Sequence, residues 1–272
     1  MLTDPHVARC LSAIRALSEA LGAELAAMSP ATWESQTNCP PWLVRDLAAH
    51  LASSGEGAAA AIRQGLAGVI DAGITREARA DREAALAAAG PAQVGAALAA
   101  ITDRFEALYA DLDETGLSAI CFHRRGNRPA RWYAVHRLAE VAFHGWDLHL
   151  SLGETPELAD DVAALMLPTL LESNAPRTYA AGQSVQRGTG ERYMLAVADD
   201  PMARWLVTVG PDALTAVRGD APADLTVTGS AAALALLVYG RRDLGALFQA
   251  RAVWLDGDAA LADRFALVFP RP

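Results

Sequence analysis

The segment RWYAVHRLAEVAFHGWDLHL, residues 131–150, carries several side chains that can bind a metal or move a proton. His136, Glu140 and His144 follow one another at intervals of four residues, and Asp147 lies three residues further on. Residues three or four positions apart on an α-helix lie on the same face, so these groups would form one stripe. Such a stripe occurs both on the polar face of an ordinary helix and in a site for a divalent metal.

A metal site would need a further ligand from another helix. Glu140 and His144 can supply two ligands, and His50, in the segment DLAAH, is the natural third because bundles build metal sites from facing helices. Two nitrogens and one oxygen suit Zn²⁺ first, and also Fe²⁺, Ni²⁺ or Mn²⁺. We expect His136 to support or pack against this site rather than to be a ligand. Two roles stay open for Asp147, which could orient a ligand imidazole or neutralise an arginine.

The elements that must position these residues are long amphipathic helices. Apolar residues at steps of three and four predict four helices in the first 152 residues, which favours a four-helix bundle. These helices are expected at residues 5–28, 42–65, 91–113 and 129–152. Residues 66–90 are rich in alanine and charge, and no clear order is predicted for them.

The second part of the chain has a different texture. We expect a connector helix at 156–174, short strands bounded by Gly, Pro or Asp, and further helices. The strands are expected at 192–198, 204–209, 225–228 and 253–255, and the helices at 230–239 and 258–268. The fold class is therefore α+β with two domains, residues 1–153 and residues 154–272.

Composition excludes several classes of protein. The chain has 272 residues, a net charge of −9 and 52% hydrophobic residues, which argues against a nucleic-acid or membrane partner. No apolar run approaches the length of a membrane span and the N-terminus does not resemble a signal peptide, so we expect a cytoplasmic protein. Its three cysteines form no disulfide framework. Cys10 is expected to be buried, Cys39 lies in a loop, and a lowered pKa is one possibility for Cys121 beside its basic neighbours.

Two stretches resemble a known family. CPPWLVRDLAAHLA (39–52) and AEVAFHGWDLHLSLG (139–153) are similar to the two ligand-bearing motifs of the mycothiol-dependent maleylpyruvate isomerase family, within the DinB-like superfamily of metal-binding four-helix bundles. The resemblance implies the same ligands that the spacing indicates, His50, Glu140 and His144.

The resemblance extends to the C-terminal part of the chain. DLTVTGSAAALALLVYGRRDLGAL (224–247) and VWLDGDAALADRF (253–265) resemble the sterol-carrier-like domain that family members often add. The family's active site includes an arginine from this domain, and Arg241, Arg242 and Arg251 are the candidates here. The resemblance does not choose among them.

The expected function is a metal-dependent enzyme that uses a thiol, mycothiol by resemblance, as an S-transferase or a cis–trans isomerase. A Lewis-acidic metal favours the thiolate, which would add to a small electrophile, and arginines could hold a carboxylate on it. The expected partners are these two small molecules, with the chain a monomer or homodimer. Two alternatives remain: a metal-dependent hydrolase with Asp147 or His136 as base, and a non-catalytic small-molecule binding protein.

Overall fold

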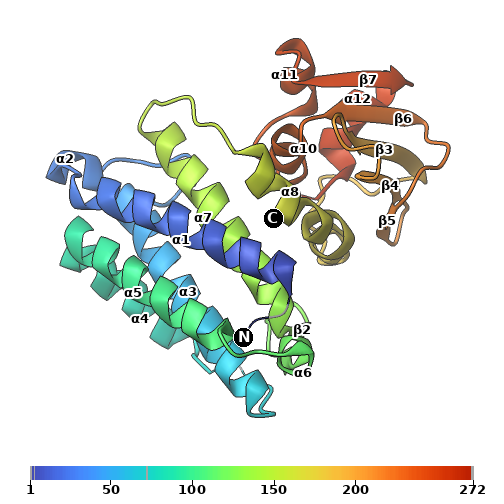
Figure 1. The fold of residues 1–272 in the computed structure, drawn as a ribbon. Helices are drawn as coiled ribbons and strands as arrows, with labels where there is room; N and C mark the ends of the chain where they lie inside the picture. The colour runs from blue at the N-terminus through green and yellow to red at the C-terminus, as the bar shows by residue number, and fades with distance from the viewer. Residues whose placement is uncertain (1, 3, 72, 271–272) are drawn as a thin grey trace. The chain divides into compact units, whose positions relative to one another are not determined.

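The computed structural model describes residues 2, 4–71 and 73–270 and divides into two compact units, Met1–Leu158 and Ala159–Pro272 (Figure 1). Each unit is described by itself. The predicted domain boundary, after residue 153, falls in the segment between the last helix of the first unit and the first helix of the second. Among the described helices, none combines the length and the apolar character needed to cross a membrane. The expected cytoplasmic location stays a prediction.

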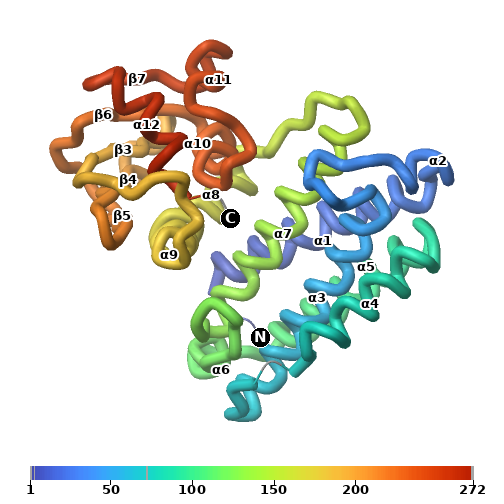
Figure 2. Tube along the Cα trace, turned by 180° about the vertical axis from the view of Figure 1, so that it is seen from behind, coloured from blue at the N-terminus to red at the C-terminus, as the bar shows by residue number. Residues whose placement is uncertain are grey.

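The first unit is a helical bundle, as predicted. α1 and α3 each pack against both α5 and α7, which makes these four helices the body of the bundle (Figures 1 and 2). The helices of this unit are α1 (Pro5–Ala26), α2 (Pro30–Trp33), α3 (Val44–Leu66), α4 (Arg76–Ala89), α5 (Pro91–Tyr109), α6 (Glu114–Ser118) and α7 (Ala130–Ser151). A two-stranded antiparallel ladder of β1 (Ile120–Cys121) and β2 (Arg128–Pro129) precedes α7.

Local signals set where the bundle helices begin. The carboxylate of Asp4 accepts hydrogen bonds from the backbone N–H groups of His6 and Val7, and Pro5 occupies the first turn of α1. Asp46 accepts from the backbone N–H of Leu43 at the start of α3. These caps satisfy N–H groups that have no partner within the helix, so each helix starts close to its predicted position.

Helix α4 differs from the prediction of no clear order at 66–90. It begins after Thr75, whose hydroxyl accepts a hydrogen bond from the backbone N–H of Ala78. Of its described residues only Ala87 is buried, so the segment lacks the apolar stripe on which periodicity depends. A cap and a high alanine content support the helix instead. α4 lies along α3 and α5 (Figure 2).

The second unit has the predicted α+β class. A five-stranded sheet has the order β5-β4-β3-β6-β7, and its pairs are antiparallel except for parallel β3 and β6. Its strands are β3 (Glu191–Val197), β4 (Arg204–Val209), β5 (Leu214–Arg218), β6 (Leu225–Gly229) and β7 (Val253–Gly257). The helices are α8 (Asp160–Thr169), the π-turn η1 (Leu170–Asn174), α9 (Ala175–Ala180), α10 (Ala231–Val238), α11 (Leu244–Gln249) and α12 (Ala260–Val268). β5, α9 and α11 were not predicted.

The predicted connector helix at 156–174 begins later and is interrupted. α8 contains Pro168, and Pro176 lies in the first turn of α9, on either side of η1. Proline has no backbone N–H to donate, so α-helical hydrogen bonds are lost at Pro168 and Pro176. Between the two prolines the backbone widens to the π-helical pattern of η1. One helical run therefore becomes three short pieces.

Candidate metal centre

Side chains from two helices of the first unit converge at one point. His50 comes from α3, while Glu140 and His144 come from α7. One possible ligand atom from each of the three lies within 4.8 Å of the others. Oε2 of Glu140 is 3.3 Å from Nε2 of His50 and 3.9 Å from Nε2 of His144. The predicted trio is therefore brought together, with side chains only 12–15% exposed.

Buried apolar residues on the same helices set the orientation of His50, Glu140 and His144. On α3, Leu47 and Leu51 are at most 1% exposed and flank His50 in sequence. On α7, Val141 and Phe143 are buried between the two ligand candidates. Burial of these neighbours fixes the rotation of each helix about its axis, which turns His50 and Glu140 toward each other.

Charges within the cluster shift the titration of its members. Burial alone would raise the pKa of Glu140, but the hydrogen bond from His50 and the charges of His136 and His144 hold that pKa well below its usual range. Burial lowers the pKa of His50, and hydrogen bonds to Glu140 and Glu83 outweigh it, so the net shift is upward. Glu140 is thus an ionised carboxylate among imidazoles. Two imidazole nitrogens and a carboxylate oxygen at this spacing are a donor set that fits a divalent metal such as Zn²⁺.

Asp147 and Cys39 lie beside the same histidine. Oδ2 of Asp147 is 3.1 Å from Nδ1 of His144, so of the two roles left open for Asp147 the structure shows contact with the imidazole. Cys39, His144 and Asp147 also form a second group whose possible ligand atoms lie within 4.8 Å of one another. Since His144 belongs to both groups, the thiol of Cys39 is next to the cluster.

Three further residues at the centre were not singled out from the sequence. Glu83 and Arg79 of α4 contact Nδ1 of His50 at 3.2 and 3.1 Å. The ring of Trp42 lies 4.7 Å from that of His50 and 6.1 Å from that of His144, measured between centroids. Trp42 lies within the stretch that carries the family resemblance. For α4 the one available signal is the Arg79–Glu83 spacing of four, which is common on solvated helices.

His136 lies at the edge of the cluster. Its ring stacks on that of Trp132 at 4.5 Å between centroids, with 18° between the planes. Its Nε2 is 3.9 Å from Oε1 of Glu140, and it is not part of either group of possible ligands among the described residues. His136 is thus a neighbour of Glu140, and its supporting role stays a prediction.

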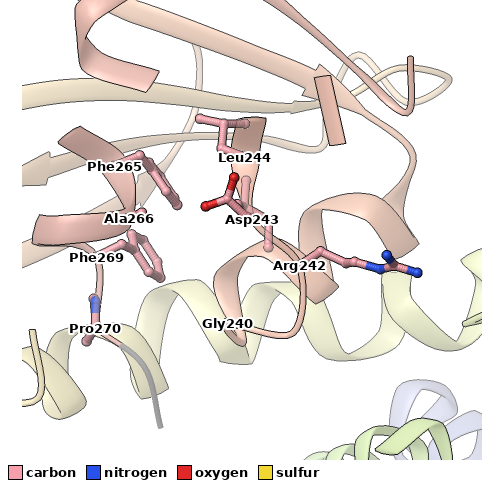
Figure 3. A pocket seen from close by; sticks show the side chains of 9 residues that line it. Gly240, Arg242, Asp243, Leu244, Phe265, Ala266, Phe269 and Pro270 are labelled. Carbon is pink, nitrogen blue, oxygen red and sulfur yellow. The ribbon is translucent and has the colours of Figure 1, made fainter. Parts of the chain in front are cut away.

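Arg241 and Arg242 follow α10 in the second unit, so their relation to the metal centre stays a prediction. The guanidinium of Arg241 lies 5.1 Å from the ring centroid of Tyr239. Arg242 lines a small pocket with Asp243, Phe265 and other residues. Figure 3 shows the phenyl rings on one side of this pocket, with the Arg242 guanidinium extending away from them. Arg251, the third candidate, is exposed and has a φ of 57°.

The cysteines other than Cys39 are buried thiols. Burial raises the pKa of Cys10 to about 12 and that of Cys121 to about 11. The possibility of a lowered pKa at Cys121 is therefore wrong, because burial disfavours the thiolate.

Comparison with known proteins agrees with the fold and the resemblance. The family described as mycothiol maleylpyruvate isomerase N-terminal domain matches residues 14–149, and the SCP-2 sterol transfer family matches residues 169–270. No curated protein matches the sequence significantly.

Two solved structures share the architecture. The crystal structure of a mycothiol-dependent maleylpyruvate isomerase superposes with a TM-score of 0.64 at 18% identity, covering 93% of this chain and 94% of that one. A histidine-to-alanine mutant of a mycothiol-dependent maleylpyruvate isomerase gives a TM-score of 0.63 at 17% identity with the same coverage. At such identities the likeness shows the fold, and the domain match supplies the family. The chain belongs to the mycothiol maleylpyruvate isomerase family, with a C-terminal domain of the SCP-2 sterol transfer family.

Proposed function

We propose that this chain is a metal-dependent enzyme that uses a small-molecule thiol, mycothiol first among candidates, as a cis–trans isomerase or an S-transferase. The observation that carries the proposal is the convergence of His50, Glu140 and His144 from two helices. Family membership supports the choice of thiol, since two solved structures that share this fold are of mycothiol-dependent maleylpyruvate isomerase. The co-substrate is a small electrophile, and monomer or homodimer stays the expected state.

His50, Glu140 and His144 would hold the metal, with Zn²⁺ the ion that best suits this donor set. A bound divalent metal with an open position would supply Lewis acidity that lowers the pKa of a thiol. Glu140 contributes a full negative charge because its pKa is well below the usual range. Asp147 holds Nδ1 of His144, which leaves Nε2 of that ring facing Glu140.

The remaining proposed residues act around this centre. His136, 3.9 Å from Glu140, contributes to the field that keeps the carboxylate ionised. Trp42 covers both ligand imidazoles with an apolar ring, which limits access of water. Arg241 and Arg242 are proposed to hold a carboxylate of the substrate, because a guanidinium is always charged and matches a carboxylate with two parallel N–H groups.

Metal content and thiol dependence test the proposal together. Wild-type protein should contain about one divalent metal per chain, and the His50→Ala/Glu140→Ala double variant should contain none. Electrophiles bearing a carboxylate should be consumed with mycothiol, and not with glutathione or without thiol. Normal metal content in the double variant would overturn the metal centre. Turnover without any thiol would indicate the hydrolase, and a lipid-like ligand bound without metal would indicate the binding protein.

The arginine assignment needs a separate comparison. Arg241→Gln, Arg242→Gln and Arg251→Gln are assayed with a carboxylate-bearing electrophile and with its neutral ester. Replacement of an arginine that holds the carboxylate should raise KM for the acid and leave KM for the ester unchanged. An equal effect on both substrates, or none on either, in the Arg241 and Arg242 variants would contradict their assignment.

A further inference from the structure

Helix α4 places an acceptor and a donor behind the imidazole of His50. Oε1 of Glu83 lies 3.2 Å from Nδ1 of His50, on the opposite side of the ring from Glu140. Arg79, one turn earlier on α4, donates from Nε to the same Glu83 oxygen at 3.0 Å. Its NH2 group is also 3.1 Å from Nδ1 of His50. The side chains of His50 and Glu83 are 12% and 27% exposed, so water competes little with these contacts.

A neutral imidazole has two tautomers, and this environment can accommodate either. With the hydrogen on Nε2, the ring donates to Glu140 and Nδ1 accepts from Arg79. With the hydrogen on Nδ1, the ring donates to Glu83, and the lone pair of Nε2 faces Glu140 and His144. Only the second tautomer leaves Nε2 free to bind a metal at the centre. When a metal takes the lone pair of Nε2, the hydrogen must lie on Nδ1 and needs an acceptor, and the Glu83 carboxylate supplies one, whereas Arg79 can only donate.

We propose that Glu83, anchored by Arg79, is a positioning residue that selects the metal-binding tautomer of His50 and couples the order of α4 to metal binding. This inference rests on the proposed function, since it concerns the same metal centre. A ligand histidine that donates its other N–H to a carboxylate is held in one orientation, and loss of such a partner typically costs about 10- to 100-fold in metal affinity. Glu83 therefore does for His50 what Asp147 does for His144.

The coupling to α4 follows from the contacts that the helix makes with His50. Ala87 is its one buried residue among those described, and Trp33 donates to the carbonyl of Ala87 at 3.3 Å near the end of the helix. In the Arg79–Glu83 part of α4 no described residue is fully buried, and Arg79 and Glu83 both contact His50. A metal that fixes His50 in the Nδ1–H tautomer strengthens its bond to Glu83 and should reduce local opening of α4.

Zinc affinity tests the positioning role. The metal-free full-length chain is titrated with Zn²⁺ against a competing chromophoric chelator, in the wild type and in Glu83→Ala and Glu83→Gln. We expect Glu83→Ala to bind zinc about 10- to 100-fold more weakly. Glu83→Gln, which keeps an oxygen acceptor and the side-chain length, should fall between it and the wild type. Glu77→Ala and Glu77→Gln, on an exposed position of the same helix, are the matched controls and should bind as the wild type does.

Hydrogen–deuterium exchange supplies a readout that a merely structural role would not move. Zinc should slow amide exchange in residues 76–89 of the wild type and of the Glu77 variants, and this slowing should be lost in Glu83→Ala and reduced in Glu83→Gln. Wild-type zinc affinity in Glu83→Ala, or the same zinc-dependent protection in Glu83→Gln, would overturn the inference. The His50→Ala variant separates the two proposals. If His50→Ala binds zinc as the wild type does, the proposed metal centre is wrong. If His50→Ala loses zinc binding while Glu83→Ala binds zinc normally, only the role of Glu83 is refuted.

Discussion

Oδ2 of Asp147 lies 3.1 Å from Nδ1 of His144, one turn apart on α7, and the Asp147 side chain is 3% exposed. This contact holds the imidazole so that its Nε2 faces Glu140. We expect Asp147→Asn, which keeps the size of the side chain but loses its charge, to weaken zinc binding by about 10-fold while the helical circular dichroism is unchanged. Asp81→Asn, at an exposed position of α4, is the control. Equal zinc affinities in the two variants would show that Asp147 does not position the ring.

The second prediction concerns Gly55, where α3 comes close to side chains of α5 and α7. A Cβ at Gly55 would lie 2.9 Å from Cγ1 of Ile101 and 3.0 Å from Cζ of Arg137. Arg137 is buried and donates to the carbonyl of Leu51 at 2.7 Å, so it cannot move aside easily. We expect Gly55→Ala to destabilise the protein by about 1–3 kcal/mol, because overpacking forces a shift of the backbone or the guanidinium.

Gly57 on the same helix provides the matched control. A Cβ there would have no atom within 4 Å, and alanine favours the helix by about 1 kcal/mol over glycine. Urea unfolding followed by circular dichroism should therefore show Gly55→Ala less stable and Gly57→Ala equally or more stable than the wild type. A similar loss of stability in both variants would indicate a general effect of substitution and not an effect of the Arg137 contact.

The third prediction concerns acid stability of the second unit. Burial raises the pKa of Glu191, but hydrogen bonds from Arg264 and from Thr189 outweigh it and hold the pKa at about 2, below the ordinary 4.5. A depressed carboxyl pKa stabilises the fold above pH 4.5, and this contribution is lost as the pH falls toward 2. The difference corresponds to about 3 kcal/mol at neutral pH, of which less than about half remains at pH 3.

Urea unfolding of the wild type and Glu191→Gln at pH 7 and pH 3 measures this contribution. The stability gap between them should narrow at the lower pH, since the wild type loses the benefit of its charged carboxylate. Asp212→Asn, an exposed position in the same unit, should leave the pH dependence of the wild type intact. A gap of constant size at the two pH values would mean that Glu191 acts through packing alone.

The fourth prediction concerns the reactivity of the thiols. Cys10 and Cys121 are buried with raised pKa values, while Cys39 is half-buried in the loop before α3. Alkylation of the native protein with iodoacetamide at pH 8 should modify Cys39 first, and all three thiols should react after unfolding. Peptide mass spectrometry identifies the labelled residue. Faster labelling of Cys121 than of Cys39 would contradict the burial of the Cys121 thiol.

Parts of the fold that depend on apolar periodicity could be predicted from the sequence. α1, α3, α5 and α7 lie close to their expected ranges because each carries a continuous apolar stripe. α4 could not be predicted in this way because its attachment is largely polar, and β5 is a strand in which only Leu214 is buried. The connector helix predicted at 156–174 begins later in the structure and is divided into α8, η1 and α9, because two prolines interrupt its hydrogen-bond ladder.

The spacing of Glu140 and His144 is enough to place them on one helix face, because hydrogen bonds between residues four apart set that geometry locally. The sequence motifs also determined the family to which the chain belongs. Tertiary packing, in contrast, brings His50 to 3.3 Å from Glu140, which lies 90 residues later in the chain, and places Glu83 on the other side of the His50 ring. Such contacts depend on which helices pack together and at what rotation, and this is set by burial of apolar side chains summed over the whole bundle.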